Sequence, residues 1–158
     1  MTDIQARPSN FPWPPLIYVA AIAASILLHF LLELPWLPSP VSDILFAIGW
    51  VLVAGGVALI VGALRAMRAA KTTSAPHKPA AHLVTNGAFG ITRNPLYLAN
   101  TLVMLGIGLI AGMPWFLILA LVAAFLTQKL AIEPEERHLD ARFGKKYREY
   151  AKKVRRWI

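Results

Sequence analysis

Residues 94–128 read NPLYLANTLVMLGIGLIAGMPWFLILALVAAFLTQ, a stretch of 35 residues without a single Asp, Glu, Lys or Arg. As one helix it would be about 52 Å long, far more than the ~30 Å hydrocarbon core of a membrane. Gly112-Met113-Pro114 stands in its middle, where a glycine can end one helix and a proline can open the next. The stretch therefore predicts two membrane-spanning helices, at about 96–111 and 115–130, joined by a tight turn.

Two further charge-free stretches precede this one, and each exceeds the ~20 residues that a membrane span requires. They predict spans at about 16–32 and 44–64. Trp13 and Trp36 flank the first span as interfacial anchors, and the linker between the spans, LPWLPSP, holds three prolines and cannot continue a helix. Small residues of the second span would let another helix approach closely: Gly49, Gly55, Gly56 and Gly62.

The composition indicates lipid as the solvent of a single domain, residues 1–158. Hydrophobic residues make up 57% of the chain and charged residues 15%, against about 25% charged residues in soluble domains. The net charge of +8 flanks apolar spans, so we expect anionic lipid headgroups and no nucleic acid as its partner. Cysteine is absent, which excludes disulfides and thiol catalysis. The polar, proline-rich N-terminus does not have the pattern of a signal peptide. The fold class expected is an all-α integral membrane protein with four spans.

Lys and Arg residues fall on one side of these spans. The linker 34–40 and the turn at Gly112 contain none, whereas the loop 65–95 contains five and the tail from Lys129 onward ten. The positive-inside rule therefore places the loop, the tail 131–158 and both termini in the cytoplasm. We expect a bacterial inner membrane from these basic loops and plain apolar spans. Pro134 suits the first turn of a tail helix, followed by an amphipathic segment with one apolar face: Tyr147, Tyr150, Val154 and Trp157.

Polar side chains gather in three segments beside the cytoplasmic ends of the spans, 77–86, 93–97 and 133–142, which we expect to converge. Asn94 would cap a helix that Pro95 opens, and Arg93 is either a membrane-edge anchor or a clamp for a carboxylate. The acidic cluster of the tail either favours a helix N-terminus through the macrodipole or holds a cationic ligand or a ribose. Its members are Glu133, Glu135 and Glu136.

Other classes of site have little support. No metal site is expected, since His77, His82 and His138 show no ligand spacing and cysteine is absent. His29 and Glu33 lie near the far interface of the membrane and are either functional or simply paired with each other. These two ionisable groups are too few to indicate a channel or a transporter. The chain contains no phosphate-binding loop or dinucleotide fingerprint.

Taken together, the cytoplasmic segments carry a recognisable combination of motifs. They are HLVTNGAF at 82–89, TRNPLYL at 92–98, and a tail motif that reads Glu135-Glu136-x-x-Leu139-x-x-x-Phe143-Gly144-x-x-Tyr147-x-x-Tyr150-x-x-x-Val154. In this order and spacing they resemble the isoprenylcysteine carboxyl methyltransferase and phospholipid methyltransferase superfamily of membrane enzymes, as a short member of bacterial type. The resemblance covers roughly residues 72–156.

The resemblance implies an S-adenosylmethionine-dependent methyltransferase of class EC 2.1.1, with its cofactor at the cytoplasmic face. The acceptor would enter from the lipid and be a lipophilic small molecule or a lipidated group: an isoprenylcysteine-like carboxylate, a thiol or an amine headgroup. Arg93 and Glu136 are implied as catalytic residues, with Arg93 orienting an acceptor carboxylate. The implied cofactor contacts are His82, Leu83, Val84, Gly87, Asn94, Pro95, Tyr97, Glu135 and Glu136.

Two positions depart from the family pattern. Asn94 replaces the family histidine, and Ala99 replaces a glycine. An amide can donate a hydrogen bond to a cofactor but cannot carry a proton. The departure at Asn94 supports an alternative reading, a catalytically inactive cofactor-binding membrane protein or a small-molecule carrier.

Overall fold

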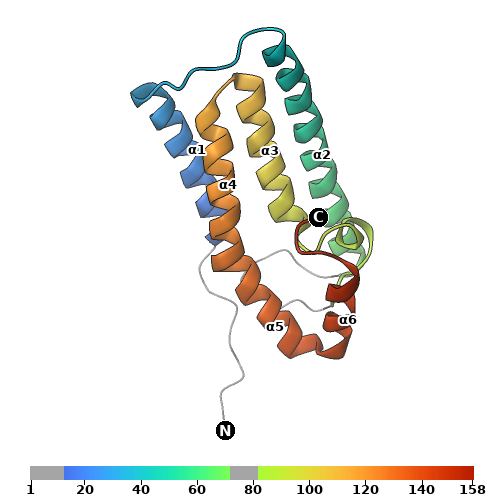
Figure 1. Ribbon diagram of the computed structural model, residues 1–158. Coiled ribbons are helices and arrows are strands. Elements are labelled where there is room, and N and C mark those ends of the chain that lie inside the picture. The colour runs from blue at the N-terminus through green and yellow to red at the C-terminus, as the bar shows by residue number, and fades with distance from the viewer. Residues whose placement is uncertain (1–12, 72–81) are drawn as a thin grey trace.

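The computed structural model describes residues 13–71 and 82–158, and within these ranges every regular element is a helix (Figure 1). This confirms the all-α fold class. These elements are six α-helices, one short 3₁₀ helix, η1, and one π-helical turn, η2. In chain order the elements are α1 (Trp13–Leu31), α2 (Val41–Ala69), η1 (Gly87–Gly90), α3 (Pro95–Ala111), α4 (Pro114–Thr127), η2 (Gln128–Ile132), α5 (Glu133–Phe143) and α6 (Lys145–Lys153).

Three of the described helical segments are long and apolar enough to cross a membrane: Pro14–Leu31, Val41–Ala69 and Pro114–Phe143. Helix α3 is a shorter apolar helix of 17 residues. Large apolar side chains remain exposed along these helices, for example Phe30, Val51 and Phe125. A surface of this kind is stable in hydrocarbon rather than in water, so the chain is a membrane protein.

Helices α2 and α3 pack with their backbones in close approach (Figure 1). A Cβ atom on Gly49 would lie 2.8 Å from the carbonyl oxygen of Gly106, and one on Gly106 would lie 2.6 Å from that of Gly49. Gly56 meets the carbonyl oxygen of Ala99 in the same way, at 3.0 Å. Gly55 has no atom within 4 Å, so it takes no part in this contact. The expected close approach of another helix is therefore present at Gly49 and Gly56 and absent at Gly55, while Gly62 faces η1, with its Cβ position 3.4 Å from Cβ of Ala88.

The turn between α3 and α4 is built on Gly112, which has a φ of +66°. A left-handed residue at this point ends α3, and Pro114 opens α4 two residues later. The indole of Trp36 packs against Gly112, 3.1 Å from where a Cβ would lie. Helix α1 packs against α4, and Trp115 Nε1 donates a hydrogen bond to the carbonyl of Leu32 at 2.7 Å.

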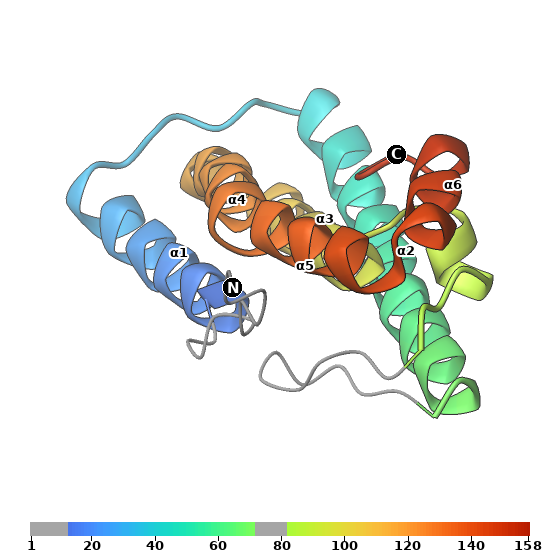
Figure 2. The same cartoon turned by 90° about the horizontal axis from the view of Figure 1, so that it is seen from below.

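Pro134 lies in the first turn of α5, as expected, but α5 does not begin as a separate helix. Helices α4 and α5 form one continuous helix, Pro114–Phe143, through the π turn η2. The wider turn accommodates Pro134, whose ring would otherwise clash with the carbonyl of Leu130 one α-helical turn earlier. The chain then reverses at Gly144, which has a φ of +50°, and α6 and the C-terminus return beneath α2 and α3 (Figures 1 and 2).

Some expectations fall on residues that are not described. These are the N-terminal segment 1–12, the side chain of Trp13, and residues 72–81 with His77. At the far end of the bundle, His29 and Glu33 do not pair within the described part of the chain. Nδ1 of His29 is buried without a hydrogen-bond partner, and its ring packs edge-on against Phe30.

Candidate active site at the base of the bundle

The start of α3 is fixed from outside the helix. The sequence suggested that the Asn94 side chain caps α3, but it makes no capping hydrogen bond. Its Nδ2 donates instead to the carbonyl of Arg156 at 2.9 Å. Thr92 Oγ1 donates to the same carbonyl at 3.1 Å, and the backbone N–H of Arg93 donates to the carbonyl of Arg155 at 3.0 Å. Pro95 occupies the first turn of the helix, where its missing N–H costs nothing. The backbone carbonyls of Arg155 and Arg156, near the C-terminus, therefore fix the residues that lead into α3.

Glu136 is the centre of an ion-pair cluster. Arg156 contacts both carboxylate oxygens, through Nη2 at 2.6 Å and through Nε at 3.1 and 3.2 Å, while Arg93 Nη1 lies 3.3 Å from Oε1. The side chains of Glu136 and Arg93 are each only 15% exposed, so solvent screens this pair poorly. The hydrogen bonds to Glu136 raise the pKa of the Arg156 guanidinium. In this structure Arg93 thus binds a carboxylate, and that carboxylate belongs to Glu136 of the same chain.

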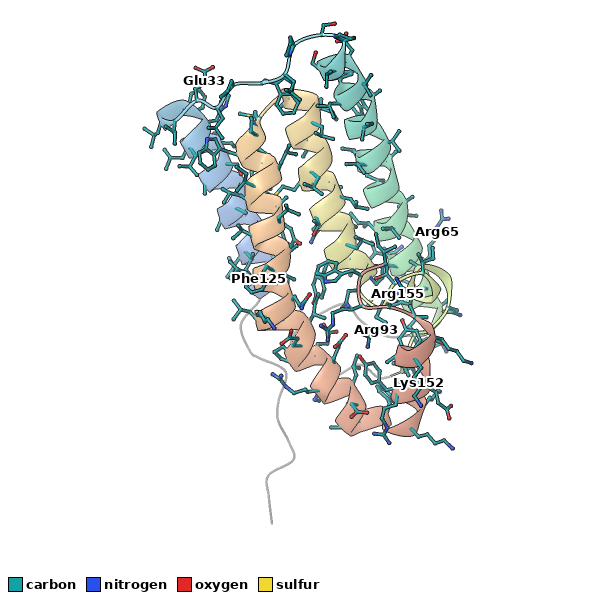
Figure 3. All side chains as sticks on the ribbon, in the orientation of Figure 1. Glu33, Arg65, Arg93, Phe125, Lys152 and Arg155 are labelled. Atoms are coloured by element: carbon teal, nitrogen blue, oxygen red, sulfur yellow. The ribbon has the colours of Figure 1, made fainter. Side chains whose placement is uncertain are left out.

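The Arg93 side chain points into the space enclosed by the base of α3, by α5 and by α6 (Figure 3). Its Nη1 also donates to the hydroxyl of Tyr147 at 3.1 Å. Its Nε is buried and has no hydrogen-bond partner among the described residues. Buried guanidinium donors normally have a partner, so an unmatched one is a place for an acceptor atom.

Glu135 differs from its neighbour. It is exposed, and the one side-chain hydrogen bond described for it comes from the hydroxyl of Tyr97 at 3.2 Å. Because α5 continues α4, neither Glu135 nor Glu136 faces a free helix N-terminus, and the macrodipole explanation of this cluster does not apply. Glu133 points elsewhere, to Lys129 Nζ at 2.8 Å.

Two tyrosines of α6 complete the wall. The hydroxyl of Tyr150 donates to the carbonyl of Phe89 in η1 at 2.6 Å, which ties α6 to the loop. Burial raises the pKa of Tyr150 to about 12. Burial and then the nearby Glu136 also raise the pKa of Tyr147. Both side chains therefore remain neutral phenols at physiological pH.

These groups surround a cavity of about 100 Å³. Six of the nine expected cofactor contacts line it, together with Arg93: His82, Leu83, Val84, Asn94, Glu135 and Glu136. The convergence of the three polar segments is therefore present in the structure. The lining also includes residues that were not singled out as site residues: Met67, Phe89, Leu139, Tyr147 and Tyr150. All but Met67 belong to the motifs that carry the resemblance, so their place in these motifs is the feature of the sequence that could have identified them as site residues.

Three expected contacts lie outside the lining. Gly87, with a φ of +59°, turns the loop and faces Ala66 of α2, 3.5 Å from where its Cβ would lie. Pro95 is buried in the first turn of α3. Tyr97 reaches the site indirectly, through its hydrogen bond to Glu135.

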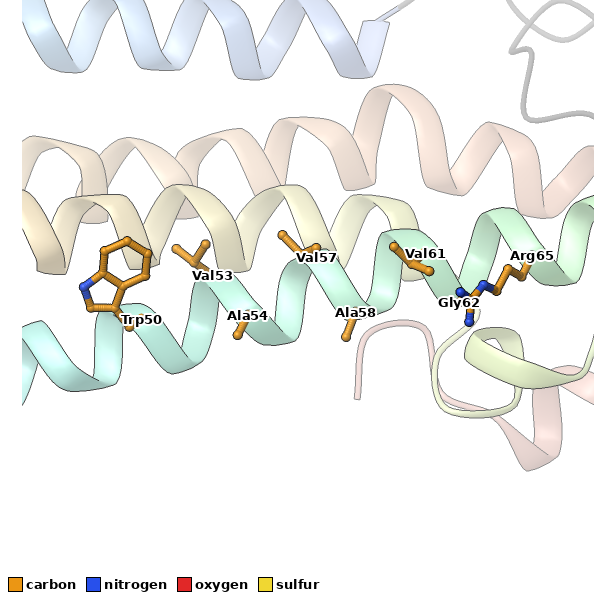
Figure 4. Close-up of a pocket in the computed structure, with 8 residues that line it drawn as sticks. All are labelled: Trp50, Val53, Ala54, Val57, Ala58, Val61, Gly62 and Arg65. Atoms are coloured by element: carbon orange, nitrogen blue, oxygen red, sulfur yellow. The ribbon is translucent and has the colours of Figure 1, made fainter.

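A larger hollow of about 590 Å³ lies on the surface of α2 (Figure 4). It is bordered by apolar side chains and ends at Arg65; its lining is Trp50, Val53, Ala54, Val57, Ala58, Val61, Gly62 and Arg65. Few polar groups converge there, whereas ligand sites combine an apolar wall with a few placed polar groups. The smaller cavity at the base is therefore the candidate active site. In the described part of the chain, no three His, Asp or Glu side chains gather as metal ligands.

Comparison with known proteins finds a family model that matches the part of the chain holding most of this cavity. A family model described as phospholipid methyltransferase matches residues 44–146, more than half of the chain. The match runs from α2 to the first residues of α6 and includes ten of the twelve residues that line the cavity; the other two, Tyr147 and Tyr150, follow directly after it. No curated protein and no solved structure matches the chain significantly.

Proposed function

Because the chain belongs to the phospholipid methyltransferase family, a family of methyltransferases, we propose that it transfers a methyl group from S-adenosylmethionine to a lipophilic acceptor in the membrane. The observation that carries the proposal is the cavity at the base of the bundle. It joins an exposed carboxylate, an unmatched guanidinium donor and apolar side chains, all within the matched region. A soluble charged donor and a membrane-borne acceptor can meet at such a place.

We place this base in the cytoplasm, with four spans and both termini on that side. Helix α3 would be the fourth span. Its 17 residues reach about 26 Å, slightly less than the ~30 Å core, which a locally thinner bilayer accommodates. The ten Lys and Arg residues from Lys129 onward then lie on the cytoplasmic side. A bacterial inner membrane is the membrane we propose.

The residues of the cavity suit the chemical groups of S-adenosylmethionine. Glu135 offers an exposed carboxylate to a cationic centre or to ribose hydroxyls, and Asn94 offers an amide oxygen. The apolar side chains of Leu83 and Phe89 suit a purine ring. The volume of about 100 Å³ is below the ~300–1,000 Å³ of small-molecule sites, so binding requires the wall to open.

When bound, the cofactor would supply a methyl group activated by a sulfonium centre. In an in-line displacement the acceptor atom bonds to this methyl carbon as its bond to sulfur breaks, and S-adenosylhomocysteine leaves. The protein's part is then positioning and exclusion of water. Arg93, with its unmatched Nε, would orient an anionic group of the acceptor, such as a carboxylate or a phosphate. Glu136 would hold Arg93 in place from the opposite side. The acceptors we propose are an isoprenylcysteine-like carboxylate, a thiol or an amine headgroup.

Transfer of labelled methyl groups tests this proposal. Protein in lipid nanodiscs would be supplied with S-adenosylmethionine and, in separate reactions, with an aminophospholipid, a prenylated cysteine and a lipophilic thiol. We expect label in one acceptor class and its loss in a Glu136→Ala, Asn94→Ala double variant. Binding of the cofactor without transfer to any of the three would favour the alternative, a cofactor-binding protein without activity. The observation behind that alternative is that Asn94 commits its amide nitrogen to the carbonyl of Arg156 and cannot carry a proton as a histidine would.

A further inference from the structure

The last five residues, 154–158, form what we call the C-terminal arm, and the arm contacts three different parts of the site. Its backbone carbonyls accept the hydrogen bonds that hold the start of α3. The Arg156 guanidinium reaches α5, with Nη1 3.8 Å from Glu133 in addition to its contacts with Glu136. Trp157 Nε1 donates to Gln128 Oε1 at 2.8 Å. The arm therefore ties α3, η2 and α5 together behind the cavity.

Arg156 occupies the key position in this arm. Its carbonyl accepts the amide hydrogen of Asn94, and its guanidinium binds both oxygens of Glu136. Asn94 and Glu136 both line the cavity, whereas Arg156 does not. One residue outside the cavity thus fixes two side chains of its wall.

The charge balance of the cluster gives this contact a consequence. Glu136 has three contacts with Arg156, the shortest at 2.6 Å, but one at 3.3 Å with Arg93. Arg156 therefore satisfies most of the Glu136 carboxylate. Arg93 keeps an unmatched donor on its Nε. Without Arg156, Glu136 would turn to Arg93 as its remaining cation, because a poorly exposed carboxylate needs a partner.

Resting on the proposed function, we propose that Arg156 is a positioning residue for S-adenosylmethionine binding: it fixes Glu136 and Asn94 in the cavity wall and keeps Arg93 available for an anionic group. Arg156 acts through these side chains and touches no ligand itself.

The chain offers a matched control in the neighbouring residue. Arg155 carries the same charge, but its side chain is exposed and has no described hydrogen bond or ion pair. Its contact with Arg93 is made by the backbone, which a side-chain substitution leaves in place. Arg155→Gln and Arg156→Gln therefore change the net charge equally and differ in the contacts that Arg156 makes with α5, chiefly those with Glu136 and the longer one with Glu133.

Calorimetric titration of S-adenosylhomocysteine into nanodisc-embedded protein tests the proposal. Losing a charge-assisted contact of this kind weakens binding by about tenfold or more, so we expect that loss for Arg156→Gln and less than about twofold for Arg155→Gln. Arg156→Lys keeps the charge without the two-oxygen contact and should fall between them. In a Glu136→Gln background, Arg156→Gln should add little, because the group it positions is gone.

A second readout needs no ligand. The backbone N–H of Arg93 is protected from hydrogen exchange by its hydrogen bond to the carbonyl of Arg155 in the arm. Losing the contact between Arg156 and Glu136 should let the arm detach more often. Exchange at this N–H should therefore be faster in Arg156→Gln and unchanged in Arg155→Gln. Equal affinities and equal exchange for the two variants would overturn the proposal. If Arg156→Gln does not fold, the comparison of Arg156→Lys with Arg155→Gln decides in the same way. Wild-type protein that binds no S-adenosylhomocysteine would refute the proposed function instead, while the exchange experiment still tests whether Arg156 holds the C-terminal arm against α3.

Discussion

The close approach of α2 and α3 gives a prediction with a magnitude, through the pair Gly106→Ala and Gly55→Ala. A methyl group on Gly106 would lie 2.6 Å from the carbonyl oxygen of Gly49 and 3.1 Å from the backbone nitrogen of Val53. Backbone atoms cannot turn away as a side chain can, so the two helices must separate. A methyl group on Gly55 would meet no atom within 4 Å.

Both substitutions replace a helical glycine by alanine and gain the same helix propensity, about 1 kcal/mol. Their difference therefore isolates the steric cost. Overpacking of a close contact costs about 1–3 kcal/mol, so Gly106→Ala should be less stable than Gly55→Ala by that amount. For a chain of this size, each kcal/mol corresponds to roughly 2–4 °C in Tm.

Thermal unfolding in a single detergent, followed by circular dichroism, measures the difference between the two variants. We expect Gly55→Ala to melt at or slightly above the wild-type temperature and Gly106→Ala to melt about 5 °C below Gly55→Ala. Equal melting temperatures would refute the packing of α2 on α3. They would also remove the basis for placing Met67 of α2 in the same cavity as Arg93.

Three further substitutions test contacts elsewhere in the molecule. Thr101→Val removes the 2.6 Å hydrogen bond with the hydroxyl of Tyr18 between α3 and α1, and should lower the free energy of unfolding by about 0.6–1.7 kcal/mol in chemical unfolding. Tyr150→Phe removes the hydrogen bond to Phe89 and should cost about 1 kcal/mol at neutral pH. Because burial raises the pKa of Tyr150 from 10.0 to about 12, its stabilisation is complete below pH 10 and is lost as the pH rises towards 12, so the variant should show a smaller alkaline loss of stability. Asn94→Asp keeps the shape but replaces the donor by an acceptor facing a carbonyl, and should weaken S-adenosylhomocysteine binding by at least about tenfold; unchanged binding would contradict the role of the amide.

The spans could be predicted from the sequence because hydrocarbon excludes charge. The absence of charged residues, with Gly112 in the middle of 94–128, was enough to separate α3 from α4. The continuity of α4 and α5 could not be predicted in this way. Pro134 ordinarily starts a helix, and the π turn that lets the helix pass through it has no clear mark in the sequence.

The site shows a similar limit. The motifs identified the segments that converge, but not the partner of each side chain. Arg155 and Arg156 are equivalent in the sequence, two basic residues in a basic tail, and only the fold gives one of them to Glu136. Glu135 and Glu136 are equally alike, yet one is exposed and the other is held by two guanidinium groups. Contacts of this kind depend on the return of the chain at Gly144, which brings residues more than 60 positions apart together.

The central claim is that the cavity at the base of the bundle binds S-adenosylmethionine. The most direct measurement is calorimetric titration of S-adenosylmethionine into the protein in lipid nanodiscs, beside the Glu136→Ala, Asn94→Ala double variant and Arg155→Gln. The account predicts saturable binding at one site per chain, retained in Arg155→Gln and lost in the double variant. No binding at millimolar cofactor, or equal binding by all three proteins, would contradict it.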